Sequence, residues 1–168
     1  PMYSRIQGLV DIPEFTCRAE EMGFKSIWVP ESPITPEPGL DCLATLGAFA
    51  EQDTKMLLGT CVVIVPLRHP AILAKEVASL DYLSNGRIVL GVGVGPSNRR
   101  EIFEVFGVNP KERGARTDEA LTIINGLWTG KPFSYKGRFY EFKDIIMEPK
   151  PVQRPRPPIW VGGESEAA

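Results

Sequence analysis

The stretch IVLGVGVG, residues 88–95, decides the fold, because it has the pattern of a buried strand that lacks side chains on one face. Gly91, Gly93 and Gly95 stand at every second position, so in an extended chain all three point the same way. Glycine in a strand costs about 0.5–1 kcal/mol relative to alanine and offers no side chain to pack. The pattern therefore predicts that another group fills the space on that face.

The segments around this strand alternate between two kinds of apolar pattern. Helical spacing predicts helices at 14–24, 40–52, 69–87 and 113–130. Shorter apolar runs predict strands at 26–31, 56–66, 88–95 and 158–163. Such alternation is typical of parallel βα units, so we expect an α/β fold with a parallel sheet. Its ligand site should lie at the carboxyl ends of the strands.

Residues 131–157 interrupt this alternation. FSYKGRFYEF at 133–142 predicts a hairpin with Lys136 and Gly137 in its turn. The proline-rich PKPVQRPRP at 149–157 should be extended, because proline has no N–H to donate to a β-ladder. An insertion of this kind is typically either a lid or a contact surface.

Composition restricts the classes of protein to which the chain can belong. The length of 168 residues suits one domain, and the net charge of −2 argues against nucleic acid or an anionic membrane as the main partner. The longest apolar stretch, at 56–66, is shorter than the ~20 residues that a membrane-spanning helix needs. The three cysteines are widely spaced and form no metal-binding motif with the single histidine. We expect a reduced, cytoplasmic protein without a metal.

The predicted strands end in residues that suit a ligand. The first is followed by PESP at 30–33, which places a carboxylate and a hydroxyl at the rim, although an acidic turn would look the same. The second contains GTCV at 59–62, where glycine indicates either a bulge or a simple kink. The fourth ends at Gly162-Gly163, and a helix expected from Glu164-Ser165 would make this a phosphate cradle.

Other candidate residues are less specific. His69 precedes Pro70 at a predicted helix start, so we expect it to pack or cap rather than to catalyse. Arg68 either meets an anion at that helix start or is solvated. The glycines of 88–95 do not match the dinucleotide fingerprint, because position 96 is Pro96. A nicotinamide dinucleotide site is therefore not expected.

Taken together, the motifs resemble the luciferase-like monooxygenase superfamily, and within it the oxidoreductases that use the deazaflavin coenzyme F420. The resemblance covers about residues 14–168 and is carried by AEEMGFKSIWVPE, LLGTCVVIVPLRHP, AKEVASLDYLSNGRIVLGVGVG, RGARTDEALTIINGLW and PKPVQRPRPPIWVGGESEAA. It implies a TIM barrel with a flavin or deazaflavin at the carboxyl ends of the strands. Residues 1–168 would then be a partial (β/α)8 barrel of four to five strands, about half of the fold.

The resemblance also assigns roles to the strand ends. It places an acidic residue and its neighbour beside the cofactor ring, a bulge with a non-prolyl cis peptide at Cys61-Val62 behind the ring, and glycines at its edge and tail. The implied cofactor-binding residues are Glu31, Ser32, Thr60, Cys61, Val62, Gly93, Gly95, Gly162 and Gly163. Gly91 lies deeper and would accommodate a bulky neighbour. Two positions depart from the family pattern, with Ser32 in place of a histidine and Pro96 in place of a glutamate, so the usual acid/base partners are missing and none is assigned. Glu31 and Ser32 are only weak candidates for a catalytic role.

The resemblance implies an oxidoreductase that transfers hydride to or from a small organic substrate, with coenzyme F420 as the expected cofactor. An FMN-dependent monooxygenase is the first alternative. A non-catalytic half-barrel that self-associates is the second. Since half a barrel leaves open edges, we expect the chain either to be part of a longer protein or to associate with a second copy as a homo-oligomer.

Overall fold

A parallel sheet forms the centre of the molecule in the computed structural model, which describes residues 11–36 and 39–163. The strands are β1 (Ser26–Val29), β2 (Leu57–Thr60), β3 (Val63–Ile64), β4 (Ile88–Gly93) and β7 (Ile159–Val161). All the pairings between them are parallel, and β4 pairs with β2, β3 and β7. The expected α/β fold with a parallel sheet is therefore confirmed, and the described strands form an open sheet rather than a closed barrel.

A β-bulge separates β2 from β3. Four residues lead from Gly59 to Val63, whereas three lead from Val89 to Val92, their partners on β4. The extra residue falls at the Cys61-Val62 peptide, which is cis. The bulge that the glycine at 59 indicated is confirmed. The single strand predicted at 56–66 is instead two short strands followed by the 3-10 turn η1 (Val65–Leu67).

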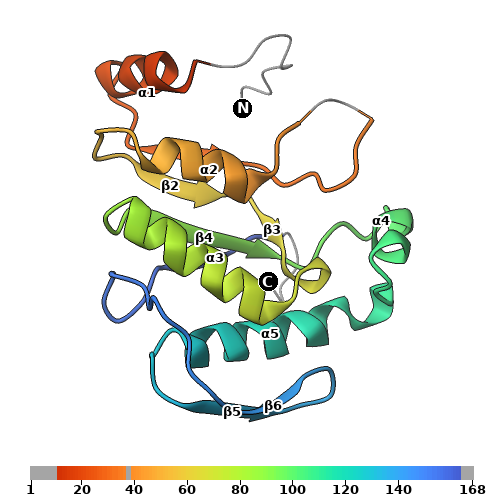
Figure 1. Ribbon diagram of the computed structural model, residues 1–168. Coiled ribbons are helices and arrows are strands. Elements are labelled where there is room, and N and C mark those ends of the chain that lie inside the picture. The colour runs from red at the N-terminus through yellow and green to blue at the C-terminus, as the bar shows by residue number, and fades with distance from the viewer. Residues whose placement is uncertain (1–10, 37–38, 164–168) are drawn as a thin grey trace.

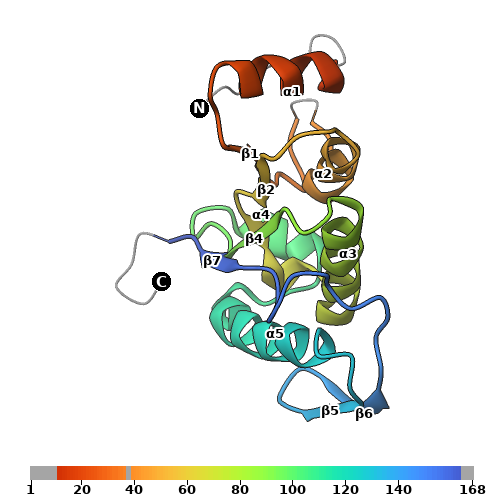
Figure 2. The ribbon, with the colours of Figure 1, turned by 90° about the vertical axis from the view of Figure 1, so that its left-hand side faces the viewer.

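Helices cover one face of the sheet, and one short helix, α4 (Arg100–Val105), lies beyond its carboxyl end (Figure 1). The other helices are α1 (Ile12–Glu21), α2 (Cys42–Ala50), α3 (Pro70–Leu83) and α5 (Arg113–Leu127). Figure 2 shows α2 and α3 on the same side of the sheet. Ile88, Leu90 and Val92 belong to one buried cluster with side chains of these helices, so these alternate positions of β4 face the helical layer. The other face carries Trp28 and Trp160, whose rings stack 5.0 Å apart.

Local sequence explains where α3 begins and ends. The Nδ1 atom of His69 accepts a hydrogen bond from the Ala71 N–H at 3.3 Å, and Pro70 occupies the first helical position. This confirms the expected capping role of His69. Asn85 and Gly86 follow the helix with positive φ angles of 53° and 79°, which stop it and turn the chain into β4.

Two short elements were not predicted from the sequence. The helix α4 and the 3-10 turn η2 (Pro110–Glu112) lie between β4 and α5. The helix α4 has six residues, of which only Ile102 and Phe103 are buried. Two adjacent apolar residues do not make a helical pattern, so the sequence gives no sign that this segment is a helix rather than a loop.

The insertion forms a hairpin and a strap. The strands β5 (Phe133–Lys136) and β6 (Glu141–Ile145) are antiparallel, and the Gly137 N–H donates to the Tyr140 carbonyl at 2.9 Å, which confirms the predicted hairpin. Figures 1 and 2 show it beside α5, where the Glu119 carboxylate accepts hydrogen bonds from the Arg138 and Phe139 N–H groups.

The proline-rich strap is bound to the end of α3 by one buried carboxylate. Asp81 accepts from the N–H groups of Val152 and Gln153 at 2.8 and 3.0 Å, and from the Gln153 side chain at 2.6 Å. The Gln153 amide also donates to the Ile88 carbonyl at 2.8 Å. The strap therefore closes the amino end of the sheet. No described helix is long and apolar enough to cross a lipid bilayer.

Candidate functional site

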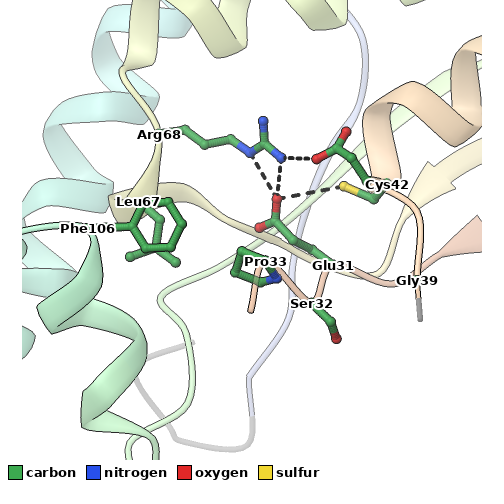
Figure 3. A pocket seen from close by; sticks show the side chains of 9 residues that line it. Glu31, Ser32, Pro33, Gly39, Cys42, Leu67, Arg68 and Phe106 are labelled. Carbon is green, nitrogen blue, oxygen red and sulfur yellow. Dashed lines mark hydrogen bonds and ion pairs between the residues drawn. The ribbon is translucent and has the colours of Figure 1, made fainter. Parts of the chain in front are cut away.

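A pocket of about 370 Å³ opens at the carboxyl ends of β1 and β3, the edge of the sheet where a ligand was expected (Figure 3). Its walls come from the loop after β1, the start of α2, the turn before α3 and the end of α4. They consist of Glu31, Ser32, Pro33, Gly39, Asp41, Cys42, Leu67, Arg68 and Phe106. No residue of 131–157 lines this pocket, so the lid that the insertion could have provided is not seen here.

Glu31 is the most constrained side chain of the pocket, since only 4% of it is exposed. Its Oε1 atom accepts from Arg68 Nε at 2.9 Å and from Nη2 at 2.6 Å. Its Oε2 atom accepts from the Ile64 N–H at 2.5 Å. The carboxylate therefore ties the end of β1 to β3 through charge-assisted hydrogen bonds.

Arg68 connects three carboxylates. Besides Glu31, its Nη2 atom donates to Asp41 Oδ2 at 2.7 Å, and its Nη1 atom lies 3.7 Å from Glu76 Oε2. Burial is the largest single effect and would lower the pKa of the guanidinium, but the hydrogen bonds and charges of Glu31 and Asp41 together outweigh it and hold the pKa above its ordinary value. Neither sequence-based interpretation of Arg68 was right, because its partners are acidic residues from other elements.

Cys42 and Asp41 complete the polar side of the pocket. Burial, together with the charges of Glu31 and Asp41, raises the pKa of the Cys42 thiol to about 12. The thiol therefore stays protonated, and it lies 3.8 Å from Glu31 Oε1 as a donor. Burial alone would raise the pKa of Asp41, but the Ala44 N–H and the Arg68 guanidinium outweigh it and lower the pKa. Possible metal-ligand atoms of Glu31, Asp41 and Cys42 lie within 4.8 Å of one another, yet both carboxylates are already paired with the Arg68 guanidinium.

The bulge fills most of the space that the glycines leave open. A Cβ atom on Gly91 would lie 1.9 Å from the Thr60 carbonyl oxygen, and one on Gly93 would lie 2.7 Å from Val62 Cγ2. One on Gly162 would lie 2.9 Å from Val62 Cγ1. Val62 therefore occupies the space over Gly93, and the expected place of Gly93 at the edge of a cofactor ring stays a prediction. The neighbour expected at Gly91 is present, and it is a backbone carbonyl.

The remaining predicted residues fall into different surroundings. Gly95 has a φ of 84°, and a Cβ there would lie 2.8 Å from both Ile64 Cγ2 and Phe103 Cζ, so a turn and close packing account for this glycine. Thr60 is 2% exposed, and its hydroxyl donates to the Gly91 carbonyl at 2.7 Å. Cys61 and Gly163 are exposed. The helix expected to start at Glu164-Ser165 lies outside the described residues.

The structure thus gathers the predicted residues into two groups. Glu31 and Ser32 line the pocket, whereas Val62 is packed against Gly93 and Gly162. The Ile64 N–H joins the two groups through its hydrogen bond to Glu31. The role of Arg68 could not be found by sequence reasoning, because its partner Glu31 precedes it by 37 positions and only the adjacency of β1 and β2 brings them together.

Known proteins with similar sequences include enzymes of two cofactor types. The chain is 34% identical over 163 residues to an F420-dependent glucose-6-phosphate dehydrogenase of Microbacterium testaceum, covering 94% of this chain and 48% of that protein. It is 33% identical to the oxygenase component of a flavin-dependent trigonelline monooxygenase of Acinetobacter baylyi, covering 85% of this chain and 40% of that protein. The chain spans about half the length of these relatives.

A solved structure shares the fold over a similar extent. An F420-dependent secondary alcohol dehydrogenase in complex with an F420-acetone adduct superimposes with a TM-score of 0.76 at 28% identity, covering 89% of this chain and 47% of that one. The expectation of about half a barrel agrees with this coverage. The family described as luciferase-like monooxygenase matches residues 1–168. The chain therefore belongs to the luciferase-like monooxygenase family.

Proposed function

We propose that residues 1–168 form one partial barrel domain of an F420-dependent oxidoreductase, which transfers hydride to or from a small organic substrate. The observation that carries this proposal is the bulge, because Val62 lies wedged against Gly93 and Gly162 beside a pocket lined by Glu31 and Ser32. These are the positions at which the family resemblance places the cofactor. The F420-dependent relatives among proteins of similar sequence and structure favour the deazaflavin.

The residues present fit a planar ring at the bulge. Val62 is half-buried and packs so closely against Gly93 and Gly162 that neither glycine has room for a Cβ atom. The branched side chain of Val62 is therefore held in place and offers a surface on which a ring can rest. Ser32 would supply a hydroxyl beside it, and Gly163 would present its backbone N–H near the tail, whereas the Gly162 N–H already donates to the Val92 carbonyl at 2.8 Å. The chemistry that a bound deazaflavin supplies is hydride transfer at a ring carbon.

The protein side chains would then orient the reactants. Glu31 accepts three hydrogen bonds from Arg68 and Ile64, so it serves as a fixed anchor of the pocket wall rather than as a proton carrier. Ser32 has the one hydroxyl that lines the pocket, and no group in the described part of the chain forms a hydrogen bond with it. We therefore assign to Ser32 the hydrogen bond to a substrate or cofactor oxygen.

The second candidate function is an FMN-dependent monooxygenase, favoured by the similarity to the flavin-dependent trigonelline monooxygenase. Titration of the purified protein with F420 and, separately, with FMN tests both, with cofactor fluorescence as the readout. We expect saturable binding of F420 that Val62→Ala weakens. Val152→Ala, in the strap at the other end of the sheet, is the matched control and should leave binding unchanged. Binding of FMN alone would favour the monooxygenase.

The open sheet supports the proposal that the barrel is completed by other residues. Trp160 is 55% exposed beside Trp28, on the face opposite the helices, and both β1 and β7 have a single partner strand among the described residues. Either the rest of a longer chain or a second copy would cover this face. Sedimentation velocity discriminates these, since a folded, active monomer would exclude self-association. Absence of both cofactor binding and turnover would favour the non-catalytic half-barrel.

Free cysteines support the expected location. Cys17, Cys42 and Cys61 all carry free thiols, which suits the reducing cytoplasm.

A further inference from the structure

The charge balance of the pocket restricts what can bind there. Glu31 and Asp41 line it and Glu76 approaches from α3, whereas Arg68 is the one cationic side chain among its described lining residues. Three carboxylates therefore face a single guanidinium. Building on the proposed function, we propose that this pocket takes an uncharged substrate that carries a hydroxyl group, and that it discriminates against anions.

The guanidinium of Arg68 is not available to an anion. Its Nε and Nη2 atoms donate to Glu31 Oε1, and Nη2 also donates to Asp41 Oδ2. Its Nη1 atom faces Glu76 Oε2 at 3.7 Å, and the arginine side chain is only 21% exposed. An incoming phosphate or carboxylate would have to displace a carboxylate that is already in place. Like charges held close in this way repel the ligand.

Asp41 is the acceptor best placed for a ligand hydroxyl. Its Oδ1 atom is occupied by the N–H groups of Leu43 and Ala44, both at 2.9 Å, as the cap of α2. Its Oδ2 atom accepts only from Arg68 among the described residues, and 48% of the side chain is exposed. A carboxylate oxygen has room for a second donor. Asp41 Oδ2 can therefore accept a hydrogen bond from a ligand O–H.

The other side of the pocket is apolar. Leu67 and Phe106 lie away from Cys42 across the pocket in Figure 3, and Phe106 is 42% exposed. They offer a surface for the carbon skeleton of a small ligand. Arg99 donates to the Ile34 carbonyl in the loop after β1, but its charge is paired with Glu101 at 3.0 Å. This ion pair adds no net positive charge to the rim.

A matched pair of probes tests the inference on the full chain without cofactor. Lactate is 2-propanol with a carboxylate in place of one methyl group, so the two differ mainly in charge. Binding is followed by the amide NMR signals of Leu43, Ala44 and Ile64, which touch the pocket carboxylates. We expect 2-propanol to shift these signals, and lactate to bind at least about fivefold more weakly, as about 1 kcal/mol of repulsion at 4 Å in water implies.

Asp41→Asn sharpens the test. Asparagine caps a helix as well as aspartate, so the fold should be retained while one negative charge is lost. We expect the preference for 2-propanol over lactate to fall about fivefold, whereas Asp118→Asn, at an exposed position of α5, should leave it unchanged. Equal binding of both probes, binding of neither, or an unchanged preference in Asp41→Asn would overturn the inference. Because cofactor is absent, failure of the protein to bind F420 would refute the proposed function alone.

Discussion

The two ends of the sheet are each closed by a buried carboxylate, but the partners of these carboxylates differ. At the carboxyl end, Glu31 is held by the Arg68 guanidinium, which also pairs with Asp41, a half-exposed carboxylate of the pocket. At the amino end, Asp81 is fully buried and accepts from backbone and amide N–H groups of the strap. The ion pairs at the carboxyl end leave the Asp41 carboxylate open to a ligand. The N–H donors at the amino end leave no such group, because Asp81 is buried beneath the strap. In (β/α) barrels the carboxyl end carries function and the amino end carries stability, which matches this division.

The largest effect is expected from removing the cation at the carboxyl end. Arg68→Met leaves Glu31 buried without a counter-charge, which costs about 3–5 kcal/mol of unfolding free energy. Urea unfolding followed by circular dichroism measures this loss. Arg99→Met is the control, because the exposed Arg99–Glu101 pair should contribute less than about 1 kcal/mol. Equal losses in the two variants would show that the Glu31 cluster is not a buried ion pair in solution.

A smaller loss is expected at the amino end. Asp81→Asn replaces one acceptor oxygen by an NH2 group, so at least one buried N–H of the strap loses its partner, at a cost of about 1–3 kcal/mol. The pocket should be unaffected, and the 2-propanol shifts of Ile64 should match those of the unaltered protein. If Asp81→Asn changes ligand binding as strongly as Arg68→Met does, the two ends are not independent.

Disturbing the packing of Val62 against Gly93 should lower the free energy of unfolding by as much as Asp81→Asn does, or by less. Gly93→Ala forces its Cβ against Val62, which costs about 1–3 kcal/mol. Adding Val62→Ala should recover most of that loss, so the two substitutions should couple by about 1 kcal/mol in a double-mutant cycle. Gly47→Ala in α2 is the control, because its Cβ would have an ordinary contact of 3.7 Å with Leu80. If the losses of stability from Gly93→Ala and Val62→Ala are simply additive, Val62 does not pack against Gly93 in solution.

The smallest effect concerns pH. Burial raises the pKa of Glu76 above its ordinary value, although the charge of Arg68 partly opposes this. The folded state therefore holds this proton more tightly than the unfolded state, so the stability from Glu76 is present below pH 4.5 and is lost as pH rises through the folded pKa. Glu76→Gln should make the protein slightly more stable at pH 7 and leave it unchanged near pH 4. Thermal unfolding at both pH values measures this, and a loss of stability at pH 7 would contradict it.

The sequence predicted the elements better than it predicted their contacts. Alternating glycines correctly indicated a face without side chains, but whether a cofactor, Val62 or the Thr60 carbonyl fills it depends on the register between β3 and β4. Periodicity located the long helices, whereas α4 buries too few residues to give a pattern. The ion pair of Arg68 with Glu31 requires the pairing of β1 with β2, which no local signal encodes. The positions implied by family resemblance do gather at one edge of the sheet, yet their roles in binding stay predictions.

The tight packing of Val62 against Gly93 and Gly162 also limits which substitutions this part of the proposed cofactor site can accept. Its two methyl groups lie against the surfaces of Gly93 and Gly162, and each of those positions would clash with a single added carbon. A larger side chain at position 62, 93 or 162 would therefore clash with its neighbours. Val62→Ala and Val62→Gly would instead leave a cavity beside the two glycines. Because Val62→Ala is also expected to weaken F420 binding, a library that seeks to accept bulkier substrates would leave position 62 and both glycines as they are and vary the pocket lining instead.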